Sequence, residues 1–152
     1  MSAADARRGR VLIVESRYYP DIADGLIAGA VPMVEDAGYS IERLEVPGVF
    51  EIPAAIRHAA KSGAYAGFLA FGCVIRGETS HYDHICNEAS RAIMDLTMQD
   101  GLALGFGVLT CENGDQAAVR ADPNGKNKGA EAARACLAMI DVRHRFNEGG
   151  AP

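Results

Sequence analysis

The segment of the sequence best suited to chemistry is a polar stretch, residues 76–84, that reads RGETSHYDH. It contains two histidines, His81 and His84, and an imidazole can gain and lose a proton near pH 7. Thr79 and Ser80 can cap a following helix, and the unpaired backbone N–H groups of a helix start can bind an anion such as phosphate. The residues leave two interpretations open: a helix cap alone, or a cap combined with an anion site.

Aromatic side chains near predicted strand ends could form a wall for a flat ligand. Tyr18 and Tyr19 follow the first apolar run of the chain, and Phe50 and Phe106 belong to the same expected edge. Aromatic faces can stack on a heterocycle. Ordinary packing at the edge of the core explains the same residues, so the aromatic pattern allows a site without requiring one.

Cations near a glycine-rich stretch, residues 124–129, could also serve an anionic ligand. The stretch is no nucleotide phosphate loop, because Lys126 is followed by Asn127 rather than Ser or Thr and the upstream glycine spacing is wrong. No G-x-G-x-x-G motif follows the first apolar run, which argues against a dinucleotide site. Arg120, Lys126 and Lys128 are therefore either solvated loop charges or contributors of positive charge to a smaller anion.

The cysteines predict reduced thiols with a mainly structural role. Cys73, Cys86, Cys111 and Cys136 lie far apart and form no C-x-x-C motif. A nucleophilic pair of Cys86 with a histidine is conceivable. However, Cys86 falls on the apolar side of its predicted helix, where a buried thiol is usually inert.

Length and composition predict one soluble globular domain over residues 1–152, with a flexible arm at 1–9 and a flexible tail at 147–152. The chain has 49% hydrophobic residues, and no apolar run reaches the roughly 18 residues of a membrane span. Its start lacks the apolar core of a signal peptide, so we expect a cytoplasmic protein with no membrane partner. A net charge of −5 with mostly scattered cations argues against nucleic acid as a partner.

Short apolar runs alternate with amphipathic segments along the chain. The run Val11–Val14 is rich in β-branched residues, which is typical of a parallel strand covered on both faces. Between residues 21 and 37 apolar residues recur every three or four positions, which indicates a helix. The same reasoning predicts strands at 10–15, 40–46, 67–75 and 102–110, and helices at 21–37, 52–61, 85–101, 115–120 and 128–146.

Strands that alternate with helices imply parallel pairing through right-handed crossovers. The predicted fold class is therefore α/β, a three-layer α/β/α sandwich around a four-stranded parallel sheet. Ligands of such sheets bind beyond the carboxyl ends of the strands. We therefore expect the functional residues in the loops at 16–20, 47–51, 76–84 and 111–114.

Taken together, these segments resemble the lumazine synthase family, from Val11 to about Arg145. The strongest match is GCVIRGETSHYD at 72–83, followed by CNE at 86–88. Further matches in the same order are VPGVFEIP at 46–53, FGVLT at 106–110 and NKG at 127–129 with Glu131. The resemblance implies the flavodoxin-like version of the predicted fold.

The resemblance also implies an activity. The family condenses 5-amino-6-(D-ribitylamino)uracil with 3,4-dihydroxy-2-butanone 4-phosphate to 6,7-dimethyl-8-ribityllumazine, releasing phosphate and water. The implied partners are these small molecules, and no metal or organic cofactor is implied.

The family's functional residues carry over to named positions of this chain. The implied proton-transferring residue is His81, and the implied phosphate site combines Glu78 and Thr79 with Arg120. The other implied substrate-binding residues are the stacking Tyr18, the pyrimidine-contacting Val49, Phe50 and Glu51, the strand-end Cys73, Val74 and Ile75, and the pocket residues Phe106 and Lys128.

The resemblance further implies a homo-oligomer, a pentamer with active sites at subunit interfaces. Tyr18, Phe50 and His81 would come from one subunit, and Phe106 and Arg120 from the next. The chain departs from the family pattern in two places.

The first departure concerns stacking: Tyr18 is followed by Tyr19, so either ring is a candidate for stacking. The second concerns assembly. The unusual loop at 121–126 and the short N-terminal arm argue against assembly of pentamers into a larger shell.

Three alternatives differ in their predictions. The related archaeal-type riboflavin synthase shares the fold, but the segments 49–51 and 77–81 favour lumazine synthase. A module that holds lumazine or flavin without turnover, or a mainly structural assembly, would not need both His81 and Arg120. Lumazine absorbance and phosphate release on mixing both substrates separate these alternatives.

Overall fold

The computed structural model describes residues 8–147 of the chain. Its strands are β1 (Gly9–Ser16), β2 (Tyr39–Val46), β3 (Gly67–Ile75) and β4 (Leu104–Cys111). Its helices are α1 (Pro20–Asp36), α2 (Ile52–Ala60), α3 (His81–Gln99), α4 (Gly114–Ala121) and α5 (Lys128–Asn147), with a short 3₁₀ turn, η1 (Val49–Glu51), before α2.

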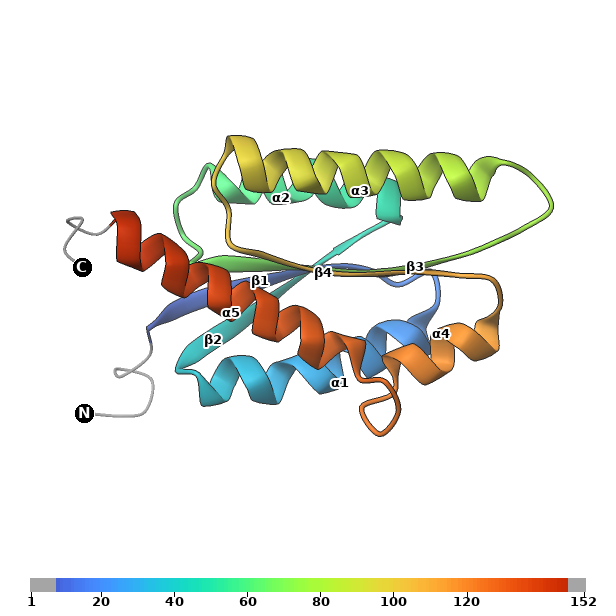
Figure 1. Cartoon of the computed structure of the whole chain (residues 1–152), viewed down its shortest axis with the longest axis horizontal. Coiled ribbons are helices and arrows are strands. Elements are labelled where there is room, and N and C mark those ends of the chain that lie inside the picture. Colours follow the sequence, from blue (N-terminus) through green and yellow to red (C-terminus); the bar gives the residue numbers. More distant parts are fainter. Residues whose placement is uncertain (1–7, 148–152) are drawn as a thin grey trace.

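The strands form one parallel sheet in the order β2-β1-β3-β4. Helices α2 and α3 cover one face, and α1, α4 and α5 cover the other (Figure 1). The predicted three-layer fold with a four-stranded parallel sheet is therefore confirmed, and its order matches the flavodoxin-like arrangement. The order reverses between β1 and β3, and ligands of doubly wound sheets bind at the carboxyl ends next to such a reversal.

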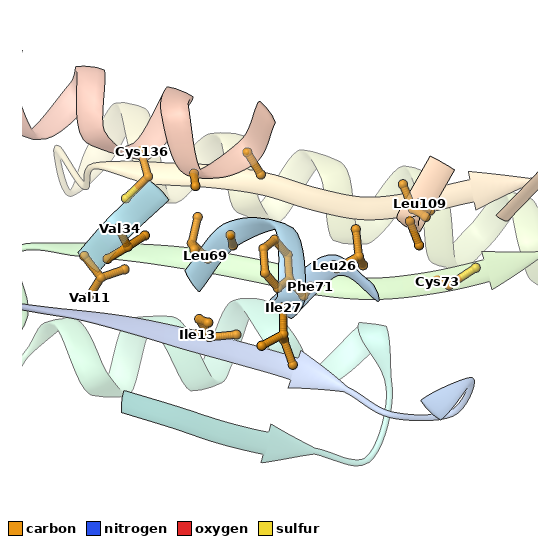
Figure 2. Packing of buried hydrophobic residues seen from close by; sticks show 14 of the residues in the cluster. Val11, Ile13, Leu26, Ile27, Val34, Leu69, Phe71, Cys73, Leu109 and Cys136 are labelled. Atoms are coloured by element: carbon orange, nitrogen blue, oxygen red, sulfur yellow. The ribbon is translucent and has the colours of Figure 1, made fainter. Parts of the chain in front are cut away.

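The central strands are apolar without interruption because each one feeds two cores. In β1, Val11 and Ile13 point to the core under α1 and α5, whereas Leu12 and Val14 point to the core under α2 and α3. Figure 2 shows the first of these cores, where Phe71 of β3 lies among side chains of α1. Burial on both faces selects the β-branched composition that identified these strands in the sequence.

Glycines allow the long helix α5 to lie close to its neighbours. A Cβ at Gly129 would come within 2.0 Å of the carbonyl oxygen of Leu26 in α1. A Cβ at Gly105 of β4 would come equally close, 2.0 Å, to the carbonyl oxygen of Ala132 in α5. The start of α5, which carries Lys128, is therefore held tightly against both α1 and β4.

Some predicted boundaries were wrong. Helix α3 begins at His81 rather than near residue 85, because its first turn is polar and shows no apolar periodicity. Strand β4 begins at Leu104 rather than at 102, after Gly101 with a φ of +65°. At the ends of the described chain, Gly9 belongs to β1 and Asn147 to α5. The remaining parts of the expected arm and tail, 1–7 and 148–152, lie outside the described residues.

Within residues 8–147, none of the helices combines the length and the apolar character that crossing a membrane requires.

Candidate active site

The loop after β1 presents one aromatic ring to solvent. Tyr18 is 75% exposed, whereas Tyr19 packs against the core under α1. The two rings meet edge to face with their centroids 5.0 Å apart, and burial raises the pKa of the Tyr19 hydroxyl. Of the two candidate stacking residues, Tyr18 therefore has the open face.

An ion cluster centred on one buried carboxylate, that of Glu15, holds this loop in place. Glu15 at the end of β1 is only 1% exposed and accepts hydrogen bonds from Arg43 Nε at 2.7 Å and Arg17 Nη1 at 2.8 Å. Arg17 also donates to Asp24 of α1 at 2.7 Å. Burial alone would raise the pKa of Glu15, but the hydrogen bonds and charges of Arg43 and Arg17 outweigh burial and lower it.

This cluster was not predicted from the sequence, although Glu15 is a carboxylate at the end of an otherwise apolar strand. A buried charge almost always has a partner, so Glu15 itself was the available signal. Because Arg17 directly precedes Tyr18, the ion cluster also fixes the backbone next to Tyr18, whose ring is exposed.

The turn η1 brings the segment 49–51 to the carboxyl end of β3. Val49 is buried, and a Cβ at Gly72 would lie 2.8 Å from its Cγ2 atom, so the bare glycine lets η1 approach the sheet. Phe50, in contrast, is 61% exposed, and Glu51 is exposed beside it. An aromatic face and a carboxylate are thus displayed at this edge.

The end of β3 contributes a row of small and apolar side chains. Cys73 is buried next to Cys111, and Val74 and Ile75 are half-buried (Figure 2 shows Cys73 near the end of its strand). Burial raises the pKa of Cys73 to about 12, and burial likewise raises the pKa of Cys86. Both thiols stay protonated at neutral pH, which agrees with the structural role predicted for the cysteines.

The first turn of α3 combines a cap with the histidine of the polar stretch. The Thr79 Oγ1 atom accepts a hydrogen bond from the His81 backbone N–H at 3.3 Å, whereas Ser80 makes no side-chain cap. His81 is the first residue of the helix, and Glu78, Thr79 and His81 are all exposed. Exposed N–H groups at the start of a long helix can bind an anion.

Three further predicted residues lie elsewhere, along the outer edge of β4. Phe106, Arg120 and Lys128 line a cavity of about 450 Å³ between this strand and the helices α4 and α5. Phe106 is 44% exposed. Arg120 donates to the Gln116 carbonyl at 3.1 Å, and the Lys128 ammonium lies 2.9 Å from Glu131 Oε2.

The predicted site residues thus form two groups within one subunit. The carboxyl-edge group gathers at the ends of β1 and β3, at η1 and at the start of α3: Tyr18, Val49, Phe50, Glu51, Cys73, Val74, Ile75, Glu78, Thr79 and His81. The β4-edge group is Phe106, Arg120 and Lys128. Among the described residues, no strand pairs with the outer side of β4, so this edge of the sheet is open beside the β4-edge group.

The fold and the carboxyl-edge group define the class of the protein: a doubly wound α/β protein with aromatic, acidic and imidazole side chains gathered next to the reversal of its strand order. Comparison with known proteins then identifies the family.

A sequence model of the 6,7-dimethyl-8-ribityllumazine synthase family matches residues 8–144. The chain is 50% identical over 138 residues to 6,7-dimethyl-8-ribityllumazine synthase of Novosphingobium aromaticivorans, covering 91% of this chain and 99% of that one. It is 46% identical over 150 residues to the Bartonella henselae protein of the same name, covering 97% of both chains. The chain belongs to the 6,7-dimethyl-8-ribityllumazine synthase family and is a transferase of riboflavin biosynthesis.

Proposed function

We propose that this chain condenses 5-amino-6-(D-ribitylamino)uracil with 3,4-dihydroxy-2-butanone 4-phosphate to form 6,7-dimethyl-8-ribityllumazine. The observation that carries the proposal is the carboxyl-edge group, in which an exposed aromatic ring, a carboxylate, a histidine and a helix start lie at one end of the sheet. The relatives that share about half of the sequence bear the name of this product.

The uracil substrate binds at the ends of β1 and β3. The exposed ring of Tyr18 stacks on the pyrimidine, and the segment 49–51 contacts its polar edge. The bottom of this uracil site is formed by the side chains of Cys73, Val74 and Ile75. This part of the site orients the uracil substrate toward the second substrate. The two molecules then react within one complex rather than by a chance encounter.

The phosphate of the second substrate binds at the start of α3. The segment Glu78–Thr79 provides backbone N–H groups there, and an arginine, Arg120, supplies a bidentate partner for the phosphate. Schiff-base formation releases water, elimination releases phosphate, and ring closure releases water again. Each step moves a proton, and His81 at the helix start is the group placed to transfer it. No cofactor takes part in this scheme.

The working form in this proposal is a homopentamer with active sites at subunit interfaces. Arg120 and Phe106 lie on the outer edge of β4, apart from the carboxyl-edge group, so one subunit completes the site of the next. Contacts between unlike surfaces generate closed rings when the rotation closes. We expect this ring of single-domain chains in the cytoplasm, with neither nucleic acid nor membrane as a partner.

The direct test is to mix the purified protein with both substrates and to follow lumazine absorbance together with phosphate release. We expect both signals in equal amounts. Tight binding of lumazine without either signal would instead identify a binding module. Lumazine consumption with riboflavin formation would identify a riboflavin synthase.

A further inference from the structure

Arg76, the first residue of the polar stretch, lies between β3 and the loop to α3 and contacts several other segments of the chain. Its backbone N–H donates to the Cys111 carbonyl at 2.9 Å, and its Nε atom donates to Glu112 Oε2 at 2.8 Å. Both partners belong to the junction between β4 and α4. Arg76 therefore ties the end of β3 to the end of β4.

The same side chain also reaches the first turn of α3. Its Nη1 atom lies 3.4 Å from Asp83 Oδ1, and its guanidinium carbon lies 4.3 Å from the centre of the Tyr82 ring. Burial raises the pKa of the Tyr82 hydroxyl, and the Thr110 side chain of β4 lies close enough to act on that pKa in the opposite direction. Arg76 thus links the first turn of α3, through Asp83 and the Tyr82 ring, to the junction of β4 and α4.

The loop between Arg76 and α3 has few contacts of its own. A Cβ at Gly77 would meet no atom within 4 Å, and residues 77–80 are exposed. Within this stretch the Thr79 Oγ1 atom accepts a hydrogen bond from the His81 backbone N–H. The loop and the β4–α4 junction lie at the same end of the sheet (Figure 1), so a link between them sets where the helix starts.

We infer that Arg76 is a positioning residue: it fixes the start of α3, and with it His81 and the segment Glu78–Thr79, against the junction of β4 and α4. The inference rests on the proposed function, which makes this helix start the phosphate site. Two carboxylates already engage the guanidinium, so Arg76 acts by holding the backbone rather than by meeting the phosphate.

An arginine suits this role better than a lysine. The planar guanidinium donates to Glu112 through Nε and forms an ion pair with Asp83 through Nη1, while its face lies on the Tyr82 ring. A lysine keeps the positive charge but has one ammonium group and no planar fork. Substitution to lysine therefore separates the effect of charge from the effect of position.

The experiment uses four variants of the full chain: Arg76→Ala, Arg76→Lys, Glu112→Gln and the control Arg91→Ala. Arg91 also pairs with two carboxylates, Glu88 and Asp95, but on the exposed surface of α3. Glu112 contributes to the start of α4 through its backbone N–H, which donates to Gln116 at 2.8 Å and is retained in Glu112→Gln.

Steady-state kinetics with each substrate varied should show a selective loss. For both Arg76 variants we expect kcat/KM for the butanone phosphate to fall by about tenfold or more, since a shift of about 1 Å can lower a rate about a hundredfold. The constant for inhibition by inorganic phosphate should rise in parallel. Glu112→Gln should change both quantities in the same direction by about three- to tenfold, the effect of losing one charged hydrogen bond. Arg91→Ala should stay within about twofold, as exposed ion pairs do.

A second measurement does not depend on turnover. Amide hydrogen exchange of residues 77–84 in the substrate-free protein should be several-fold faster in both Arg76 variants than in wild type and Arg91→Ala. If wild type makes no lumazine but this exchange difference appears, the proposed function fails and the positioning role stands.

Two results would overturn the inference. One is a folded Arg76→Lys protein with wild-type kinetics and wild-type exchange. The other is Glu112→Gln with unchanged constants while either Arg76 variant weakens phosphate inhibition, which would make Arg76 a direct phosphate ligand. If Arg76→Ala does not fold, the lysine and Glu112 variants still decide between these results.

Discussion

Single side chains in this protein differ in how firmly the fold holds them. Glu15 is buried and forms ion pairs with two guanidinium groups, whereas His81 is exposed and donates a hydrogen bond from its backbone N–H. A buried charge without its partners is strongly destabilising, while an exposed imidazole can be removed without disturbing the core. Substitutions at these two residues should therefore separate stability from catalysis.

The first prediction concerns His81. In His81→Ala we expect turnover to fall by about ten- to a thousandfold with an unchanged melting temperature, because one positioned proton carrier is lost while water or buffer replaces part of its action. The measurement is kcat across pH 6 to 8, with His58→Ala, an exposed histidine of α2, as the control. Wild-type turnover in His81→Ala throughout this pH range would exclude a proton-transfer role.

The second prediction concerns Arg120. In Arg120→Ala the KM for the butanone phosphate should rise about tenfold or more, because a charged, bidentate contact is lost, while the KM for the uracil substrate changes much less. Arg134→Ala, an exposed arginine of α5, is the matched control. An unchanged KM for the phosphate substrate would remove Arg120 from the site.

The third prediction concerns Glu15 and pH. The lowered pKa of Glu15 means that the folded state favours its ionised form, so this stabilisation is present above the ordinary value of 4.5 and is lost as pH falls through the lowered folded pKa. Glu15→Gln should lower the free energy of unfolding at pH 7 by about 1–3 kcal/mol and flatten its decline in acid.

Urea unfolding at pH 7, 5 and 4 measures this effect. Glu45→Gln is the control, since Glu45 faces the same Arg17 at 4.0 Å but is 67% exposed. If the free energy of unfolding declines equally in acid for wild type and Glu15→Gln, the ion cluster does not cause the pH dependence of stability.

At the scale of elements, the approach of α5 to α1 is set by glycine, and a fourth prediction tests it. Gly129→Ala should lower the free energy of unfolding by about 1–3 kcal/mol, because its Cβ would meet the Leu26 carbonyl at 2.0 Å and the helices must separate. Gly114→Ala is the control, since a Cβ there meets nothing within 4 Å. Thermal or urea unfolding compares the two, and equal stability would contradict the close contact.

The elements that could be predicted from the sequence are those with a repeating apolar signal. The run at Val11–Val14 has such a signal because the strand is buried on both faces. The start of α3 lacks one, since its first turn, with His81 and Asp83, is turned to solvent. The ends of elements at a functional edge are therefore the least predictable part of this fold.

The contacts that support the candidate site were beyond prediction for a related reason. Glu15 and Arg43 are 28 positions apart, and Arg76 and Glu112 are 36 apart, so no local pattern pairs them. The choice between Tyr18 and Tyr19 likewise depends on the direction of one loop. The residue types of the site could be predicted from the sequence, whereas the pairs that hold them needed the structure.

At the scale of the whole molecule, the two edges of the sheet differ. The outer strand β2 carries charged residues, Glu42, Arg43 and Glu45, which discourage pairing with another chain. The other outer strand, β4, has the uncharged sequence LGFGVLTC and exposes Phe106 beside a cavity. An apolar, uncharged edge is suited to a contact with a second copy of the chain.

The last prediction follows from this difference between the edges. If the carboxyl-edge group of one subunit meets the β4 edge of the next, His81 and Arg120 of one site belong to different chains. The impaired His81→Ala and Arg120→Ala proteins, unfolded together and refolded as a mixture, should then regain part of the wild-type activity when it is assayed at a butanone phosphate concentration well below the KM of Arg120→Ala. Some interfaces in such mixed rings combine an intact His81 with an intact Arg120, and each variant refolded alone provides the baseline. Sedimentation should show a pentamer or a pair of pentamers, because the contact joins unlike surfaces and closes into a ring. A fully active monomer, or mixed rings without any recovery, would mean that each chain builds its own site.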